Sequence, residues 1–408
     1  MVDALPLLET KEKSTVTVNA EFAQLLPGTS NIVDGEGTSF IDDFENTITP
    51  YSLLAPQGWK LAAVPTRDQR FDLANGAVST SAGNNFDLGA GYRRAKMAWY
   101  QVDNLFYRQG GSFKPANITD QDLKNHYTRP VLPQEIFPFK DPFIGNFYEP
   151  VFDVAFFPDE RGPYNYNPIF DSEPPRNNWG GITTAIRNEV DFDKANVEYV
   201  EFWMLNPFIQ NPNGEVIVNN AKRASNTTGG KLIFHLGSVS EDLARDGKHG
   251  FENGLTKDGS TTNLTETAWG RVTNQQFVNN AFDADANSRT NQDVGADGLK
   301  NADEQAKFGS LVGQNNPDPS SDDFKYFLGP DYDANDAKIL ERYKNINGLE
   351  GNSPVVTPGQ SFAQSGIPLP DNEDLNQDNT LSDLEEYYTY EVDLGAKPND
   401  LEVGKGFI

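Results

Sequence analysis

Cysteine is absent from the 408 residues of the sequence, and this excludes disulfide bonds and thiolate metal sites. Histidine occurs only 3 times, and none of these residues stands in a metal-binding spacing such as HExxH. No serine lies in a GxSxG motif, and glycine-rich phosphate loops are missing as well. The sequence offers few of the groups that catalysis uses, so we expect a protein that is not an enzyme.

Long apolar runs are missing too. No stretch of about 18 consecutive apolar residues occurs, and no positively charged start precedes an apolar core. The sequence therefore predicts neither a membrane-spanning helix nor a secretory signal. A strand of a transmembrane barrel would escape this test, because its alternating pattern is weak in any one segment.

Positive charge is scarce, since 33 Lys and Arg residues face 60 Asp and Glu residues, giving a formal net charge of −27. Such a chain repels phosphates, so nucleic acid is excluded as a partner. The excess carboxylates have two interpretations. Either they form a solvated acidic surface, or some of them hold divalent cations that offset their mutual repulsion.

What the sequence does contain is a series of strand-like segments separated by turns rich in Gly, Asn and Pro. These segments are Ser14–Phe22, Arg94–Tyr107, Val151–Phe157, Val197–Leu205 and Lys231–Leu236. The segment Val197–Leu205 is nearly continuous in large residues, which predicts a strand covered on both faces. The whole pattern predicts a mainly β protein, built as an antiparallel, jelly-roll-like β-sandwich.

Composition divides the chain into three parts. Residues 1–30 are a lead-in that could contribute a barrel strand, and residues 31–280 hold the predicted sandwich. Residues 281–408 are rich in Asp, Asn and Gly, and we expect candidate calcium loops and short helices there, such as Asp336–Lys344.

A loop at Asp374–Glu385 has the oxygen spacing of a calcium-binding loop. The candidate ligands, in chain order, are Asp374, Asn376, Asp378, the carbonyl of Thr380, Ser382 and Glu385. Asn379 replaces the usual glycine at the sharp turn, where it can adopt the left-handed conformation. The spacing predicts bound calcium, and the alternative interpretation is an acidic helix cap.

A second loop, from Asp293 to Glu304, repeats part of this spacing. Its candidate ligands are Asp293, Asp297, the carbonyl of Leu299, Asn301 and Glu304. Gly298 stands at the sharp turn, whereas Gly295 removes a side-chain ligand. Calcium is again the prediction, with a solvated turn as the alternative.

Two further groups of carboxylates are weaker candidates. The group Asp331, Asp333, Asn335 and Asp336 has a spacing that completes no calcium loop. The group Asp42, Asp43 and Glu45 could be read as a pair of hydrolase acids, but it lies in no recognised catalytic setting.

Twelve short motifs, which run in one order along most of the chain, carry a family resemblance. They are Ala20–Gly28, Ser39–Glu45, Arg94–Tyr100, Asp159–Tyr164, Trp179–Ile182, Val197–Phe208, Leu236–Asp242, Phe251–Leu255, Trp269–Val272, Gln292–Leu299, Asp318–Phe324 and Glu350–Pro354. Together they resemble the SprA (Sov) family, the very large outer-membrane translocons of type IX secretion in gliding and related Bacteroidota.

The resemblance implies a structural segment of a protein-conducting channel, located at the outer membrane or cell surface. Its partners would be other segments of the same translocon, further components of type IX secretion and the secreted cargo proteins. Family members form a giant barrel with soluble segments inserted between its strands, and they are several times longer. The resemblance therefore implies that this chain is a piece of a longer protein.

A function from another class stays open, namely a secreted carbohydrate-binding jelly-roll module stabilised by calcium. An exposed row of Trp and Tyr side chains would favour glycan binding. Aromatic side chains buried against neighbouring strands would favour the channel segment.

Overall fold

The computed structural model describes residues 51–65, 67–68, 71, 88–108, 114–139, 148–187, 191–192, 194, 197, 199–208, 216–218, 222–224, 226–285, 288–346 and 369–395. The described residues from Leu53 onward belong to one compact unit, Leu53–Ile408. The predicted strand Ser14–Phe22 and the carboxylates Asp42, Asp43 and Glu45 lie outside the described residues.

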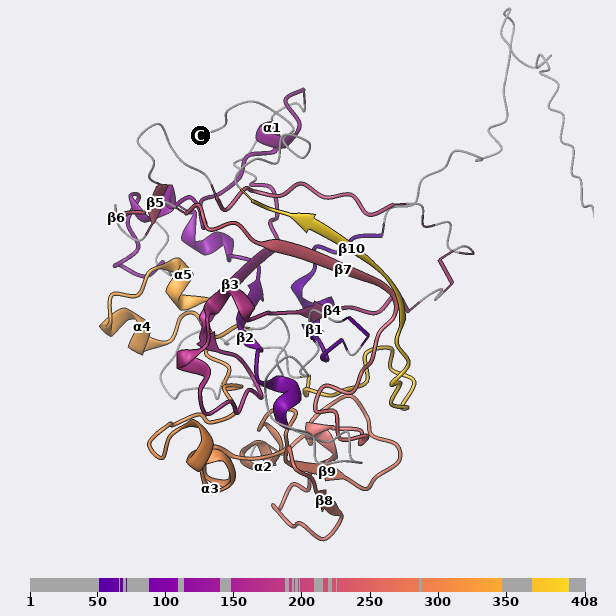
Figure 1. Cartoon of the computed structure of the whole chain (residues 1–408). Coiled ribbons are helices and arrows are strands. Elements are labelled where there is room, and N and C mark those ends of the chain that lie inside the picture. The colour runs from indigo at the N-terminus through magenta and orange to yellow at the C-terminus, as the bar shows by residue number, and fades with distance from the viewer. Residues whose placement is uncertain are drawn as a thin grey trace, which may run out of the picture. The chain divides into compact units, whose positions relative to one another are not determined.

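Antiparallel strand pairs dominate the described part of the chain, which is mainly β as predicted (Figure 1). The two long pairs are β2 (Ala95–Tyr100) with β3 (Asp153–Arg161), and β7 (Lys231–Ser238) with β10 (Glu386–Asp393). The three short pairs are β1 (Lys60–Leu61) with β4 (Ile182–Thr183), β5 (Val216–Val218) with β6 (Lys222–Ala224), and β8 (Leu264–Glu266) with β9 (Arg271–Thr273).

Within the described residues every strand pairs with only one other, so these pairs do not form the two broad sheets of the predicted sandwich. Strands β2, β3 and β7 lie in or overlap the predicted strand-like segments, but the sequence pattern does not specify which edges meet. Strand β3 also continues past Pro158, where the sequence predicts a stop. A register shift opposite Ala95 and Lys96 places Pro158 in a bulge, where its missing N–H breaks no regular ladder.

Helices are short and lie mostly in the second half of the chain. The α-helices are α1 (Pro133–Ile136), α2 (Arg289–Gln292), α3 (Asn301–Val312), α4 (Pro330–Ala334) and α5 (Ile339–Arg342). Single 3-10 turns occur at Pro56–Gly58, Leu88–Gly91, Asn104–Phe106, Asp122–Lys124, Phe170–Ser172, Pro175–Asn177 and Glu252–Gly254. Among the helices of the described residues, none has the length and apolar character needed to cross a membrane.

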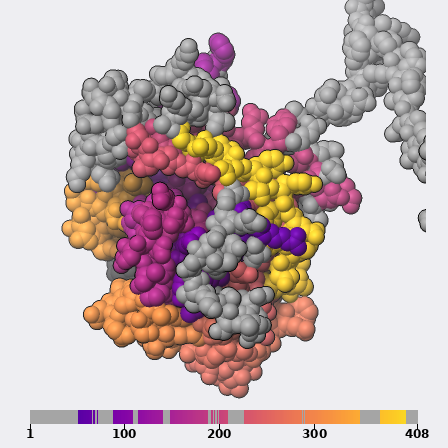
Figure 2. All heavy atoms as spheres, viewed as in Figure 1, coloured from indigo at the N-terminus to yellow at the C-terminus, as the bar shows by residue number. Residues whose placement is uncertain are grey.

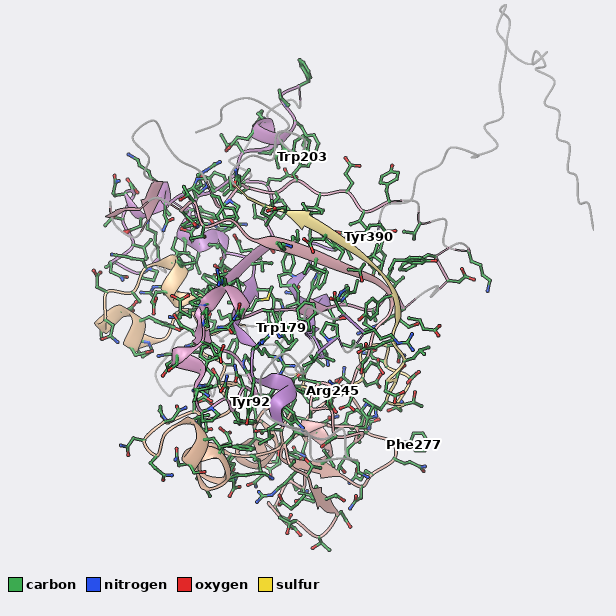
Figure 3. The ribbon with its side chains drawn as sticks, viewed as in Figure 1. Tyr92, Trp179, Trp203, Arg245, Phe277 and Tyr390 are labelled. Atoms are coloured by element: carbon green, nitrogen blue, oxygen red, sulfur yellow. The ribbon has the colours of Figure 1, made fainter. Side chains whose placement is uncertain are left out.

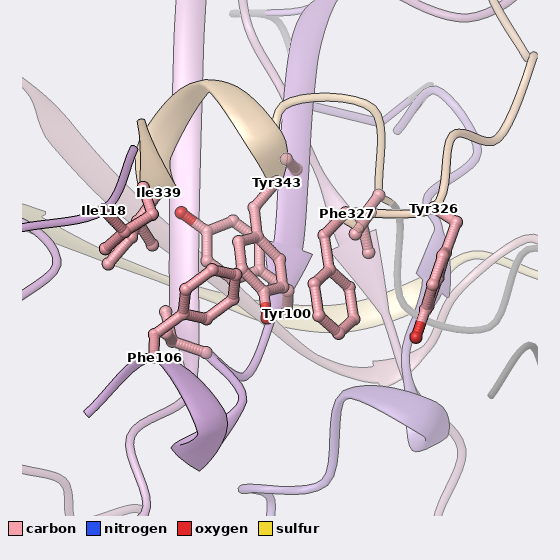
Figure 4. Packing of buried hydrophobic residues seen from close by; sticks show 10 residues of the cluster. Tyr100, Phe106, Ile118, Tyr326, Phe327, Ile339 and Tyr343 are labelled. Atoms are coloured by element: carbon pink, nitrogen blue, oxygen red, sulfur yellow. The ribbon is translucent and has the colours of Figure 1, made fainter. Parts of the chain in front are cut away.

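One core cluster joins strand β2 to the region of α5 (Figure 4). The ring of Tyr343 stacks on Tyr100 at 4.5 Å between centroids and on Phe327 at 4.8 Å. Phe106 completes the aromatic group at 5.8 Å from Phe327. Burying such rings is a large source of stability, so this cluster fixes the later helices against the β2–β3 pair.

A second core cluster joins the turn after β3 to helix α3. The ring of Tyr166 stacks on Phe308 with centroids 3.7 Å apart, and Trp269 packs 6.0 Å from Tyr166. Both clusters therefore contain residues from either side of position 280, where composition predicts a boundary. In the space-filling view the orange residues of the α3–α5 region lie directly against the magenta residues around β3 (Figure 2).

Candidate metal centre and exposed apolar face

The loop from Asp293 to Glu304 turns between α2 and α3, and it brings two of its predicted ligands to one point. Gly298 has a φ of 67°, as expected for the sharp turn. The carboxylates of Asp297 and Glu304 meet that of Asp322, with one ligand atom from each lying within 4.8 Å of the others. All three side chains are buried. We refer to Asp297, Glu304 and Asp322 as the acidic centre.

Asp322 comes from the loop after α3 and takes up space that Gly295 leaves open. A Cβ atom built on Gly295 would lie 2.0 Å from Oδ2 of Asp322. Gly295 has no side chain that could serve as a ligand in the loop motif, but it makes room for a carboxylate from another segment. Sequence spacing could not reveal Asp322, because calcium-loop patterns count only consecutive positions.

Hydrogen bonds within the protein hold most oxygens of Asp297 and Glu304. Asp297 Oδ1 accepts from the Leu299 N–H at 2.9 Å, and Asp297 Oδ2 accepts from the Ser320 hydroxyl at 2.6 Å and from the Tyr166 hydroxyl at 3.4 Å. Glu304 Oε2 accepts from the Ser320 N–H at 3.0 Å. Glu304 Oε1 is buried and has no hydrogen-bond partner among the residues that the structure describes.

Burial makes ionisation of these carboxyl groups costly. It raises the pKa of Asp297 to about 7. Burial also raises the pKa of Glu304 to about 8, and the charge of Asp297 adds to this effect. Carboxylates this close cannot all be ionised without a compensating positive charge.

The other predicted ligands of this loop lie outside the acidic centre. Asn301 is exposed, and its Nδ2 donates to the Pro317 carbonyl at 3.0 Å and to Asp323 Oδ2 at 2.9 Å. The Leu299 side chain is part of the second core cluster. Asp293 is not a member of the acidic centre, and its charge contributes to the raised pKa of Glu252.

The Asp374–Glu385 loop is wrapped around its first carboxylate. Asp374 is buried and accepts hydrogen bonds from the N–H groups of Gln377 at 2.6 Å, Asp378 at 3.1 Å and Asn379 at 3.0 Å. Asn379 has a φ of 61°, so it adopts the left-handed conformation predicted for it. The local geometry is thus ordered by backbone N–H groups.

The remaining predicted ligands of this loop bind other groups. Asp378 Oδ1 accepts from the Thr380 N–H at 2.7 Å, and Asp378 Oδ2 accepts from Asn376 Nδ2 at 3.1 Å. Glu385 is buried, and its Oε2 accepts from the Arg67 N–H at 3.0 Å. Among the described residues, no group of three clustered carboxylates includes a residue of this loop.

Three buried glutamates that the loop patterns missed organise these segments. Glu241 accepts from the N–H groups of Leu375 and Ser382, each at 3.0 Å. Glu373 accepts from the N–H groups of Ala244 at 2.9 Å and Gly250 at 2.7 Å. Burial raises the pKa of Glu373 to about 8.

The third of them, Glu252, connects the Asp293–Glu304 loop to Asp371, which precedes the Asp374–Glu385 loop. Its Oε1 accepts from Val294 at 2.8 Å and Gly295 at 2.5 Å, and its Oε2 accepts from the Asp371 N–H. Burial, together with the Asp371 charge, raises the pKa of Glu252 well above its usual range. Glu241 and Glu252 both lie in family motifs, which were the sequence signal that could have singled them out.

The acidic group around α4 is arranged differently, because its carboxylates have basic partners. Asp333 pairs with Arg342 at 2.5 Å, Asp336 pairs with Lys338 at 3.0 Å, and Asp331 pairs with Lys325. Basic side chains of the protein therefore neutralise the negative charges of these carboxylates.

An apolar stretch lies exposed where the sequence predicts a strand covered on both faces. The described residues of 197–205 form no strand, and no backbone hydrogen bond joins 199–205 to another described residue. Their large side chains are 40% to 59% exposed; they are Val197, Tyr199, Val200, Phe202, Trp203, Met204 and Leu205. The prediction of a covered strand is therefore wrong, since periodicity reports strand propensity but not a partner.

This stretch continues onto one face of the β7–β10 pair. The Phe202 ring packs 5.7 Å from Phe234 of β7. Phe234 lies opposite Tyr390 in the register, and the outward Tyr388 and Tyr390 are 76% and 56% exposed. Tyr390 belongs to β10, and Trp203 lies near the β7–β10 pair in the view of Figure 3. We call the described residues of 197–205 with Phe234, Tyr388 and Tyr390 the apolar face.

The comparisons with known proteins give one finding. The model of a family described as motility related/secretion protein matches residues 286–408, which include α2 to α5, the acidic centre and β10. No curated protein matches the chain.

Proposed function

From the relationship of this chain to the SprA family of motility-related secretion proteins, we propose that it is a structural segment of an outer-membrane protein-conducting channel. In this role it serves type IX secretion and gliding motility in a member of the Bacteroidota. It performs no chemistry of its own. It contributes shape and contact surfaces to a larger translocon.

The observation that carries the proposal is the apolar face. Soluble proteins seldom expose large contiguous apolar patches, and such patches mark interaction sites. In 199–205 the exposed side chains accompany backbone N–H and C=O groups that bond to no other described residue. Backbone groups that have no partner among the described residues can pair with an added strand by hydrogen bonding, and the neighbouring side chains then supply specificity.

The side chains of the apolar face are better suited to binding a protein than to binding a sugar. Aliphatic Val197, Val200, Met204 and Leu205 lie among the rings of Phe202 and Trp203. The exposed rings of Tyr199, Tyr388 and Tyr390 are the feature that would favour glycan binding, but the aliphatic side chains of the same face offer the hydroxyl groups of a sugar no hydrogen-bond partners. Other segments of the same translocon are the occupants that we propose.

Photo-crosslinking in the full-length protein, in the cells that make it, tests this role. A benzophenone amino acid at position 203 should give adducts with another translocon segment or a type IX secretion component. The matched control position is 277, because Phe277 is also a large exposed side chain, at 77%. Adducts to secretion components from position 277 alone, or from neither position, would contradict the proposal.

A binding assay separates this role from glycan recognition. Purified chain should pass through columns of insoluble polysaccharide without retention. If it is retained, and if Trp203→Ala or Tyr390→Ala abolishes retention, the carbohydrate-binding alternative replaces the channel segment.

A further inference from the structure

We propose that Asp297, Glu304 and Asp322 bind one divalent cation, and that this cation is calcium. The site differs from a linear calcium loop, because its third carboxylate comes from beyond helix α3. It does not depend on the channel role proposed for the chain.

The separation of the carboxylates fits a single ion. Calcium–oxygen distances are about 2.3–2.6 Å, so two oxygens on one ion are at most about 5 Å apart. One oxygen from each of the three residues lies within 4.8 Å of the others. No rearrangement of the backbone is required to bring them together.

A second observation points independently to a ligand. Glu304 is only 1% exposed, and its Oε1 is buried with no hydrogen-bond partner in the described part of the chain, while Oε2 of the same carboxylate accepts from the Ser320 N–H. A buried carboxylate oxygen without a donor is costly, and proteins rarely leave one. A bound cation supplies the missing partner at this position.

Asp297 and Glu304 have no basic partner in the described part of the chain. Within the described residues, no Lys, Arg or His nitrogen forms an ion pair with Asp297 or Glu304 at 4.0 Å or less. Two basic residues of this region bind other groups: Arg271 pairs with Glu266 and Asp303, and the Lys307 Nζ donates to the Thr267 carbonyl at 2.6 Å. The α4 carboxylates, which have Arg and Lys partners, show the contrasting arrangement.

The donor set favours calcium over other divalent ions. Every ligand group is a hard oxygen, with no thiolate or imidazole, which disfavours zinc and copper. Three carboxylates can each bind through one or two oxygens, and calcium accepts such irregular coordination. Magnesium demands near-octahedral geometry and retains several waters, which a centre of three buried carboxylates accommodates poorly.

Calcium titration of the full chain by calorimetry and native mass spectrometry tests the site. Glu304→Gln keeps the shape of the side chain and an acceptor for the Ser320 N–H, but it removes the charge. We expect this variant to lose one bound ion, or to bind it at least about tenfold more weakly. The control is Asp258→Asn, which removes an exposed carboxylate elsewhere and should leave the stoichiometry unchanged.

Terbium luminescence gives a local readout, because Tyr166 lies 3.4 Å from Asp297 and can transfer excitation to a nearby lanthanide. Emission should disappear in Glu304→Gln and in Asp322→Asn but persist in Asp378→Asn of the other loop. If the site variants fail to fold, calcium binding by the unmodified chain is the deciding measurement. No bound calcium at millimolar concentration, or magnesium bound in preference to calcium, would overturn the assignment.

Discussion

Tyr343 stacks on Tyr100 with 4.5 Å between ring centroids, and this contact joins the region matched by the family model to strand β2. Tyr343 is 2% exposed and also stacks on Phe327. Tyr343→Ala should lower the free energy of unfolding by about 3–5 kcal/mol, as for other buried aromatic truncations. Urea unfolding measures the loss. Tyr388→Ala, which truncates an exposed ring, is the control and should change stability by less than about 1 kcal/mol; equal effects would contradict the packing.

Gly295 is expected to tolerate no side chain. Its φ is 82°, and an added Cβ would collide with Asp322 Oδ2. Gly313 offers a matched control, because its φ is 111° and nothing lies within 4 Å of an added Cβ. Both Gly→Ala variants carry backbone strain of about 1–3 kcal/mol, but only Gly295→Ala should also displace Asp322. Thermal unfolding should show a clearly lower midpoint for Gly295→Ala than for Gly313→Ala.

Asp153 should make stability depend on pH in a definite direction. Burial raises its pKa to about 7, from 3.8 in the unfolded chain. Between these values the folded protein keeps a proton that the unfolded chain has released. The contribution of Asp153 to the free energy of unfolding is therefore complete below about pH 4. It is lost as the pH rises through 7, by at most about 1.4 kcal/mol per pH unit.

Asp153→Asn tests this direction. The variant should match the unmodified chain near pH 4 and exceed it in stability at pH 8, as measured by urea unfolding. Asp159→Asn, on the exposed side of the same strand, should not show this difference. A larger gain at pH 4 than at pH 8 would reverse the assigned sign.

The Asp374–Glu385 loop remains a predicted calcium site, and Asp378 provides its test. Asp378→Asn keeps an acceptor for Thr380 but removes one exposed charge. If the loop binds calcium, the ion should raise the unfolding midpoint of the unmodified chain more than that of the variant. A hundredfold excess over the dissociation constant corresponds to about 2.7 kcal/mol. Identical midpoints with calcium and with chelator would refute binding.

The sequence predicts local elements better than the contacts between them. The residue pattern identified the segments of β3 and β7, because strand propensity and periodicity are properties of one segment. The partner of β7 is β10, whose register pairs Ser238 with Glu386, and no local pattern connects positions so far apart. The exposed Trp203 shows the same limit, since large residues predict burial whether or not a partner is present in the chain.

The residues of the acidic centre were likewise only partly predictable from the sequence. Asp297 and Glu304 could be predicted because they lie within one loop motif. Asp322 could not, since helix α3 and a further loop separate it from them in sequence. The calcium-loop spacing missed Glu241 and Glu252, although both lie in family motifs, because they accept hydrogen bonds from backbone N–H groups of distant loops and such partners leave no local spacing to detect.

Because β7 pairs with β10, the order of synthesis affects how this unit folds. At ordinary elongation rates β10 leaves the ribosome roughly ten to thirty seconds after β7. During that interval β7 has an unpaired edge, and the apolar side chains of Leu232, Phe234 and Leu236 lack the neighbours that β10 supplies. A nascent chain in this state can pair with other chains, so correct maturation of this unit depends on protecting β7 until β10 arrives.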